Sequence, residues 1–268
     1  MGGNMATYAV LGATGSCGSA LVDMLLRVPD ARIHAYCRDR AKLARLFPGI
    51  LTDKRVDVFE GRVDDVSLLA ACVRGCRAVF LAISTNVNVP GCTMAQTAAA
   101  TVLAALRRPD EGEAASHRLV PRLVLLSSAS LDDRLSRNDP RPLHWILMRA
   151  ASHVYRDLRA AEHLLRAQST WITTVFMKPA GLSVDRARGH VLSLDEADGP
   201  LSYLDLAAAM IEAADDVEGR YDERNVGVTN APGTGKARFP AGGPFRLLAN
   251  VLIHYFPSSY YFLRYLIY

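Results

Sequence analysis

The sequence lacks a concentrated charge of either sign. Its 31 Lys and Arg and its 27 Asp and Glu are scattered along 268 residues, which gives a net charge of +4. Proteins that bind the phosphate backbone of nucleic acids gather their cations on one face or in one segment. The even distribution therefore predicts no nucleic-acid partner.

Cysteine is scarce and is absent after residue 92. The five cysteines are Cys17, Cys37, Cys72, Cys76 and Cys92. An odd number confined to the first part of the chain argues against a disulfide framework and indicates a reducing compartment. Cys72 and Cys76 have no His or Cys partner at zinc-site spacing, so no metal is predicted. No basic and apolar leader precedes the first strand, and we expect a cytoplasmic protein.

Apolar runs alternate with helical patterns over the first 230 residues. Strands are predicted at 7–11, 31–37, 56–63, 76–84, 122–128, 171–177 and 225–229. Helices are predicted after residue 18 and at 65–74, 91–108, 143–168 and 204–215, with a charged loop at 108–117. Continuous apolar strands separated by helices are typical of a parallel sheet covered on both faces. The predicted fold class is α/β, with a doubly wound parallel sheet.

Three glycines, Gly12, Gly15 and Gly18, interrupt the apolar pattern where the first strand meets the first helix. A helix N-terminus presents unpaired N–H groups and a partial positive charge, and glycine lets a pyrophosphate approach the backbone. The GxxGxxG spacing differs from the GxGxxG fingerprint, but the strand before it and the helix after it are the context that the motif requires. A dinucleotide is the predicted ligand, and a structural turn is the alternative.

The second predicted strand ends at a cation. Arg38 follows it, and a guanidinium there can pair with the 2′-phosphate of NADP, which favours NADP over NAD. Asp39 is the counter-argument, because an acidic residue at this place can face the free ribose of NAD. Arg40 and Lys42 could equally be a solvated helix start.

A tyrosine and an arginine share one face of the helical stretch at 143–168. Tyr155 and Arg159 are one turn apart, and a cation beside a tyrosine hydroxyl favours its phenolate form. Such a hydroxyl can pass a proton to or from a substrate oxygen while hydride moves. Ser128 or Ser130, at the end of the fifth strand, could hold that oxygen. The alternative is a surface Tyr and Arg with a strand-terminating pair of serines.

The last segment is apolar and aromatic. After a Gly- and Pro-rich connector at 231–244, residues 245–268 carry most of their side chains as Leu, Ile, Val, Phe and Tyr. Arg246, His254, Pro257 and Arg264 interrupt any run long enough to span a bilayer. Three interpretations remain open: packing over a substrate cleft, a homodimer contact, or an interfacial membrane helix.

Several segments resemble the atypical short-chain dehydrogenase/reductases, in their NmrA-like branch. They are residues 12–18, 37–43, 127–128, 159–165, 178–179 and 201–207. Within that branch, residues 154–159 and 176–183 resemble the fungal averufin oxidase A group, found in aromatic polyketide pathways. The resemblance covers nearly the whole chain, and the fold that it indicates is Rossmann-like. We expect in addition a small C-terminal segment that covers the substrate. The expected domains are a NAD(P)-binding Rossmann-like domain at 1–230, which includes parts of the cleft, and a connector with the aromatic segment at 231–268, which packs on the cleft or on a partner.

The resemblance also implies a cofactor and its binding residues. The cofactor is NADP(H), and the implied binding residues are Gly12, Thr14, Gly15, Cys17, Gly18 and Arg38, with Ala82, Ile83 and Ser84 beside the nicotinamide ribose. We expect Lys42, Lys178 and Pro179 to bind the cofactor as well. Active members carry a YxxxK pair, whereas Arg159 stands here where the lysine would be. Arginine stays protonated and cannot relay a proton at neutral pH. Tyr155, Arg159 and Ser128 are nevertheless the predicted catalytic residues.

The predicted function is that of an NADP(H)-dependent oxidoreductase acting on an aromatic polyketide of the anthraquinone, anthrone or xanthone type, in fungal secondary-metabolite biosynthesis. An apolar cleft for this small-molecule substrate would be lined by Trp145, Met148, Phe176, Met177 and Leu182 together with the aromatic tail. The alternatives are a cofactor-binding regulator or redox sensor without catalysis, and a non-redox biosynthetic catalyst on the same fold.

Overall fold

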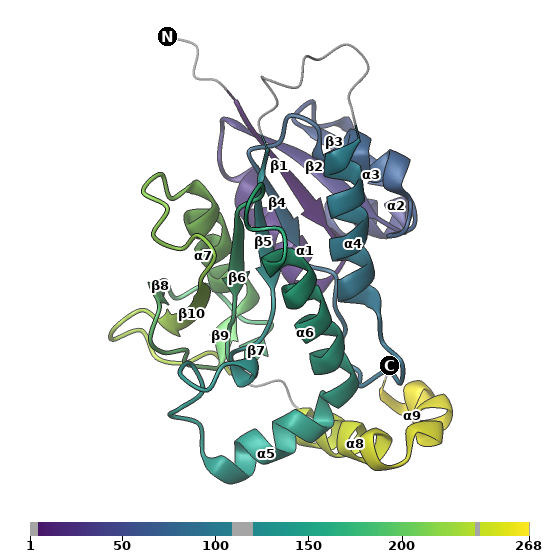
Figure 1. Ribbon diagram of the computed structural model, residues 1–268, viewed down its shortest axis with the longest axis vertical. Coiled ribbons are helices and arrows are strands. Elements are labelled where there is room, and N and C mark those ends of the chain that lie inside the picture. Colours follow the sequence, from purple (N-terminus) through teal and green to yellow (C-terminus); the bar gives the residue numbers. More distant parts are fainter. Residues whose placement is uncertain (1–4, 109–119, 239–241, 268) are drawn as a thin grey trace.

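An eight-stranded sheet forms the centre of the computed structural model, which describes residues 5–108, 120–238 and 242–267 (Figure 1). The strand order is β3-β2-β1-β4-β5-β6-β10-β8. The strands are β1 (Ala6–Leu11), β2 (Ala31–Cys37), β3 (Val56–Glu60), β4 (Ala78–Leu81), β5 (Arg122–Leu126), β6 (Thr174–Met177), β8 (His190–Ser193) and β10 (Asn225–Asn230). Most of the predicted loop at 108–117 lies outside the described residues.

All pairings in this sheet are parallel except that of β10 with β8. The predicted α/β class with a doubly wound sheet is confirmed. The antiparallel edge strand β8 was not predicted, and neither was the separate pair of β7 (Leu182–Ser183) with β9 (Leu201–Ser202). Because β1, β4, β5 and β6 are adjacent and parallel, their carboxyl ends lie along one edge of the sheet.

Helices cover both faces of the sheet. On one face α1 (Ser16–Leu26) packs against α7 (Tyr203–Asp215), and on the other α4 (Met94–Arg107) packs between α3 (Val66–Val73) and α6 (Ser152–Arg166). The alternation of side chains along a strand divides the core accordingly. Val10 joins the cluster under α1 and α7, and Leu11 joins the cluster under α3, α4 and α6. The short α2 (Arg40–Leu46) follows β2.

The predicted helix at 143–168 is in fact two helices. α5 (Arg141–Ala150) ends and α6 begins at Ala151, whose φ of −119° and ψ of 20° leave the helical region. The buried side chain of Asn88 enters this break: its amide N donates to the carbonyl of Arg149 at 3.2 Å, and its Oδ1 accepts from the N–H of His153 at 2.8 Å. A polar side chain inserted into the helical ladder is a known cause of a sharp bend.

The aromatic tail folds into α8 (Gly243–Tyr255), a short 3₁₀ turn (Pro257–Ser259) and α9 (Tyr260–Ile267). α8 lies against α5 and against the loop that follows β4, where Ala249 and Ile253 pack on Val87. The Asn250 side chain accepts from the backbone N–H of Asn88 at 3.0 Å. Within the described part of the chain, no helix has the length and apolar character needed to cross a bilayer.

Candidate active site

Gly12, in the loop between β1 and α1, and Gly18, in the first turn of α1, lie so close to neighbouring backbone that neither position has room for a side chain. Gly12 has φ +91°, and a Cβ added there would lie 2.9 Å from the carbonyl oxygen of Ala82. A Cβ on Gly18 would lie 2.0 Å from the carbonyl oxygen of Gly12. Only glycine fits at either position. The loop therefore presents bare backbone at the carboxyl edge of the sheet.

The N-terminus of α1 faces that edge without a cap. Gly15 is the N-cap residue, no side chain among the described residues accepts from the first-turn N–H groups, and the first turn holds no acidic residue. Gly15 and Ser16 are exposed. First-turn N–H groups together with the helix dipole make an anion site. The donors present here fit the pyrophosphate of a dinucleotide.

Cys17 contributes only backbone to this end of the helix. Its side chain is buried, and Sγ lies 3.7 Å from Sδ of Met210 on α7. Burial raises the pKa of the Cys17 thiol to about 12, so the thiol is protonated at neutral pH. The predicted contact of Cys17 with the cofactor is therefore restricted to its N–H.

Two charged residues follow β2: the cation Arg38, which is available to bind a ligand, and the carboxylate Asp39, which already accepts a hydrogen bond. Arg38 is exposed and makes no hydrogen bond or ion pair with a described residue. The Asp39 carboxylate accepts from the backbone N–H of Lys42 at 2.7 Å and thereby caps α2. This use of Asp39 weakens the argument for a ribose contact from that side chain. Lys42 itself has an exposed side chain.

Ala82, Ile83 and Ser84 follow β4 beside the glycine loop. The N–H of Ala82 donates to the carbonyl of Leu11 at 3.1 Å, which extends the pairing of β1 with β4 by one step. Ala82 is buried and Ser84 is exposed. The chain thus emerges from the sheet next to Gly12, as a nicotinamide-ribose contact would require.

Ser128 and Tyr155 meet at the end of β5. The Ser128 hydroxyl donates to the hydroxyl oxygen of Tyr155 at 3.2 Å, and Tyr155 is half-buried on α6. Ser130 is buried and reaches Ser128 only through its backbone N–H, at 3.4 Å. The structure therefore selects Ser128 from the two predicted serines.

A buried ion pair stands behind these two residues. The Lys178 ammonium follows β6, is 1% exposed, and lies 2.7 Å from Oε1 and 3.0 Å from Oε2 of Glu162. Ser127 donates to the same carboxylate. Buried charges persist only when they are paired and hydrogen-bonded in this way. The pair joins the ends of β5 and β6 to α6.

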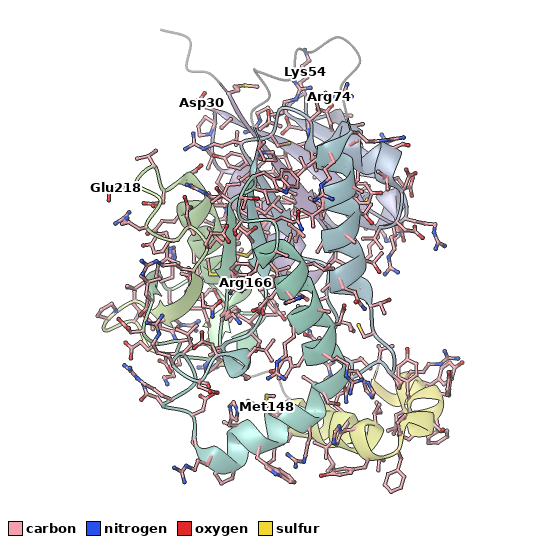
Figure 2. The ribbon with its side chains drawn as sticks, viewed as in Figure 1. Asp30, Lys54, Arg74, Met148, Arg166 and Glu218 are labelled. Atoms are coloured by element: carbon pink, nitrogen blue, oxygen red, sulfur yellow. The ribbon has the colours of Figure 1, made fainter. Side chains whose placement is uncertain are left out.

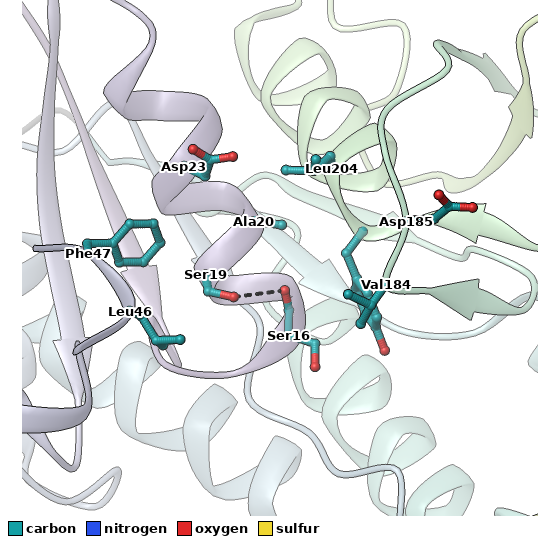
Figure 3. A pocket seen from close by; sticks show the side chains of 10 residues that line it. Ser16, Ser19, Ala20, Asp23, Leu46, Phe47, Val184, Asp185 and Leu204 are labelled. Atoms are coloured by element: carbon teal, nitrogen blue, oxygen red, sulfur yellow. Dashed lines mark hydrogen bonds between the residues drawn. The ribbon is translucent and has the colours of Figure 1, made fainter. Parts of the chain in front are cut away.

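A groove of about 360 Å³ runs along α1, next to α7 (Figure 3). It lies between residues 46–47 on one side and residues 184–185 on the other, and it begins at Ser16, whose carbonyl accepts from the Ser19 hydroxyl at 3.2 Å. None of the residues predicted to act in catalysis or to bind the cofactor lines it. It adjoins the anion site but lies on the opposite face of the sheet from Tyr155.

A family model described as NAD(P)H-binding matches residues 12–217. The chain belongs to this NAD(P)H-binding family. The match confirms the prediction of a nicotinamide dinucleotide as the ligand.

Curated fungal proteins are similar to this NAD(P)H-binding chain over almost its whole length. Oxidoreductase tpcG of Aspergillus fumigatus is 56% identical over 250 residues, which cover 93% of each protein. Oxidoreductase nsrR of Aspergillus novofumigatus is 54% identical over 251 residues, or 94% of each. Oxidoreductase claK of Passalora fulva is 50% identical over 268 residues, or 98% of this chain and 97% of the relative.

Solved structures share the fold at low identity. A short-chain dehydrogenase/reductase of Veillonella parvula in complex with NADP superposes with a TM-score of 0.65 at 21% identity, covering 88% of this chain and 99% of that one. ChuY of Escherichia coli O157:H7, an anaerobillin reductase, gives 0.61 at 18% identity over 86% and 100%. These likenesses establish the fold of the NAD(P)H-binding chain.

The structure brings some predicted site residues together and separates others. Gly12, Gly15 and Gly18 form one backbone cradle with Ala82, and Ser128 contacts Tyr155. Arg159, in contrast, is exposed and makes no hydrogen bond or ion pair with a described residue. Pro179 is buried, and its carbonyl accepts from the N–H of Ala129 at 2.9 Å. The roles of Thr14, Ile83 and Ser84 in cofactor binding remain predictions.

Two predicted cleft residues belong to the core instead. Phe176 and Met177 are fully buried on opposite faces of the sheet, because successive strand residues alternate in direction. The prediction that both line the substrate cleft is wrong. Trp145 is 51% exposed on α5, and Met148 and Leu182 are partly buried.

Sequence reasoning missed two acidic residues on α6. Glu162 neutralises Lys178, as described above. Asp157 is buried, and its carboxylate accepts from the N–H groups of Ala95 at 2.8 Å and Gln96 at 2.9 Å. An available signal was the helical period, which places Asp157 on the inward face with Val154, Leu158 and Ala161. A carboxylate on an apolar face indicates a buried partner.

Proposed function

We propose that this chain is an NADP(H)-dependent oxidoreductase of the atypical short-chain dehydrogenase/reductase type. Its proposed substrate is an aromatic polyketide such as an anthraquinone, anthrone or xanthone, in fungal secondary metabolism. The proposal depends most on one observation: the Ser128–Tyr155 hydrogen bond lies at the same sheet edge as the uncapped end of α1. A proton-transfer group and an anion site are thus presented at the same edge of the sheet.

The class of enzyme has more direct support than the substrate. Family membership and relatives at 50–56% identity confirm an NAD(P)-dependent oxidoreductase. The relatives are fungal, which supports the resemblance of residues 154–159 and 176–183 to the averufin oxidase A group of aromatic polyketide pathways. The substrate class therefore follows from that resemblance.

Tyr155 supplies the acid–base group of the proposed reaction. When bound, the nicotinamide supplies or accepts the hydride. Because Ser128 donates to the Tyr155 oxygen, the tyrosine's own proton is free to point at a substrate oxygen. In reduction Tyr155 gives that proton to the carbonyl oxygen, and in oxidation it takes the proton back. Ser128 holds the tyrosine oxygen in place for either direction.

Arg159 can support this role only by its charge. Its guanidinium remains protonated, so it relays no proton, and one helical turn separates it from Tyr155. The Glu162–Lys178 pair, one turn further along α6, contributes no net charge and fixes the ends of β5 and β6. The proton that Tyr155 gives up must then be restored from solvent or substrate.

Arg38 supports NADP(H) as the cofactor. Its exposed guanidinium follows β2 at the edge where the glycine loop lies, while the neighbouring Asp39 carboxylate already caps α2. A planar guanidinium can bind a 2′-phosphate through two parallel hydrogen bonds. The pairing of an available cation with an occupied carboxylate favours the phosphorylated cofactor.

The C-terminal segment from residue 231 is proposed to cover part of the substrate cleft. α8 is joined through Asn250 to Asn88, in the loop that continues from Ser84. A side chain of α8 also reaches the junction of α5 and α6, where His254 Nδ1 lies 2.8 Å from the Ser152 hydroxyl. The tail therefore packs on the two segments that lead to the predicted nicotinamide contact and to Tyr155.

Substitution of Tyr155 by Phe tests the proposal. Purified protein is incubated with NADPH and a panel of anthraquinones, anthrones and xanthones, and the products are analysed for a redox change at carbon. Tyr155→Phe is expected to bind NADPH as before and to lose about 10²- to 10⁴-fold in turnover. Tyr261→Phe, an exposed position on α9, is the matched control.

Three outcomes would contradict the proposal in different ways. Saturable NADPH binding without any product change in the panel would favour the cofactor sensor. Product formation without oxidation or reduction at carbon would favour the non-redox catalyst. Unchanged turnover in Tyr155→Phe would assign the acid to another group.

A further inference from the structure

All exposed aromatic side chains among the described residues lie at one end of the molecule, on α5 and in the segment from α8 to α9 (Figure 1). We call the exposed side chains of α5 and of residues 242–265 the aromatic surface. Phe262 and Tyr265 are 72% and 73% exposed. Exposed apolar patches of this kind mark interaction sites in soluble proteins.

α8 carries apolar side chains on its solvent-exposed face as well as on the face that packs against the core. Phe245, Leu248, Leu252 and Phe256 follow one another at spacings of three or four residues and are all exposed. The opposite face holds Ala249, Asn250 and Ile253, which are buried against the loop after β4. The exposed stripe is therefore left over after the helix has satisfied its packing.

Arginines contact aromatic side chains on each of the three helices. The Arg149 guanidinium lies 3.5 Å from the centre of the Trp145 ring on α5, and its Nε donates to the Tyr255 hydroxyl at 2.8 Å. On α9 the Arg264 guanidinium lies 4.7 Å from the Tyr265 ring and donates to its hydroxyl. Such pairs place a cation beside an amphipathic ring.

The charge of this surface has one sign. Residues 141–151 and 242–265 contain Arg141, Arg149, Arg246 and Arg264 and no Asp or Glu. The whole sequence has 31 basic and 27 acidic residues. The four arginines, of which Arg141 and Arg246 are exposed, give these two segments a formal charge of +4.

We propose that the aromatic surface binds the interface of a membrane containing anionic phospholipids. Apolar and aromatic side chains beside arginines, with no carboxylates, match the headgroup boundary of such a bilayer. A second copy of the chain is a poorer partner, because a two-fold contact would bring two sets of four arginines together. The protein would lie on the membrane and not span it.

Vesicle co-sedimentation tests the proposal with the full chain. Vesicles are made of phosphatidylcholine alone or with about a third phosphatidylserine, which gives a cytoplasmic-like surface charge. The protein is expected to sediment with the anionic vesicles and far less with the neutral ones. Added salt is expected to weaken the binding, because it screens the arginines.

Paired variants separate the apolar from the charged contribution. Leu248→Ser with Phe256→Ser removes two exposed apolar groups and is expected to weaken vesicle binding at least about tenfold. Its control is Val184→Ser with Val217→Ser, which changes apolar side chains elsewhere that are even more exposed. Arg141→Gln with Arg246→Gln is expected to abolish most of the preference for anionic lipid. Its control changes exposed cations away from this surface: Lys54→Gln with Arg186→Gln, of which Lys54 lies at the opposite end (Figure 2).

Three results would overturn the proposal. The first is an absence of sedimentation with either vesicle. The second is equal binding to neutral and anionic vesicles. The third is a solution dimer that Leu248→Ser with Phe256→Ser converts to a monomer, since a second copy would then cover the aromatic surface.

Discussion

The N-termini of α1 and α4 differ in whether a side chain accepts hydrogen bonds from their first-turn N–H groups. Each helix follows one of two neighbouring parallel strands, β1 and β4, and each begins with N–H groups that have no partner within the helix. In α4 the buried carboxylate of Asp157 accepts from two of them. In α1 no side chain within the part of the chain that the structure describes does so. We call the uncapped N-terminus of α1 the open end and the capped N-terminus of α4 the filled end. An external anion is expected to bind at the open end.

The comparison extends to a cysteine at each end. Helix N-termini ordinarily lower a thiol pKa, yet both thiols here have raised values. Burial raises the pKa of Cys17 to about 12. Burial, with a hydrogen bond and repulsion from Asp157, raises that of Cys92 to about 11. The raised pKa of Cys92 therefore has one cause that a substitution can remove, the Asp157 carboxylate, whereas the raised pKa of Cys17 comes from burial.

Filling the open end should have the largest effect. Ser16→Asp places a carboxylate in the first turn of α1, as Asp157 does for α4, and we expect cofactor affinity to fall by about 4 kcal/mol through repulsion of the pyrophosphate. The isosteric neutral variant Ser16→Asn is the control and should retain most of the affinity. Titration with NADPH measures both. Equal affinity in Ser16→Asp and the native protein would place the pyrophosphate elsewhere.

Emptying the filled end should destabilise the fold instead. Asp157→Ala removes two charge-assisted hydrogen bonds at α4, and we expect the free energy of unfolding to fall by about 3 kcal/mol. Asp157→Asn keeps one acceptor oxygen and should lose less. Urea unfolding gives the ranking. An unchanged midpoint in Asp157→Ala would mean that the cap contributes nothing to stability.

Arg38 tests how far the open site extends beyond the pyrophosphate. Arg38→Ala is expected to weaken NADPH binding by about 2 kcal/mol through loss of a charged hydrogen bond, with little change for NADH. Arg186→Ala, an exposed arginine outside the site, is the control. The ratio of the two dissociation constants is the measurement. An equal loss for both cofactors would remove Arg38 from the 2′-phosphate.

The smallest expected effect concerns the thiols. Asp157→Asn removes the hydrogen bond and the repulsion that raise the Cys92 pKa, so more thiolate forms near pH 8 and alkylation of Cys92 should quicken roughly threefold. Cys17 has no such neighbour and should stay unreactive in the same sample. Mass spectrometry of the alkylated peptides distinguishes the two. A Cys17 that reacts as fast as Cys92 would contradict its burial.

Local chemistry made several features predictable. β2 was predicted with its observed limits of Ala31–Cys37, and the glycine loop was placed correctly between β1 and α1. These features depend on residues close together in the chain. Ser128 and Tyr155 were also predicted to act on the same substrate oxygen, although their direct hydrogen bond was not predicted.

Features that depend on distant partners were missed. The break at Ala151 requires the Asn88 side chain, and the role of Glu162 requires Lys178 at the end of another element. That Asp157 caps α4 could be predicted only with the position of α4 known. In each case the deciding partner lies far along the chain or on a different element, where periodicity carries no signal.

Sequence alone determined the alternation of strands and helices, the bare glycine backbone and the cation after β2, because these follow from local sterics and side-chain pattern. Tertiary structure alone decided which helix ends are capped, which charges are buried as pairs and which aromatic side chains stay exposed. The physical reason is that capping, ion pairing and burial each need two groups, and only the folded chain brings both to one place.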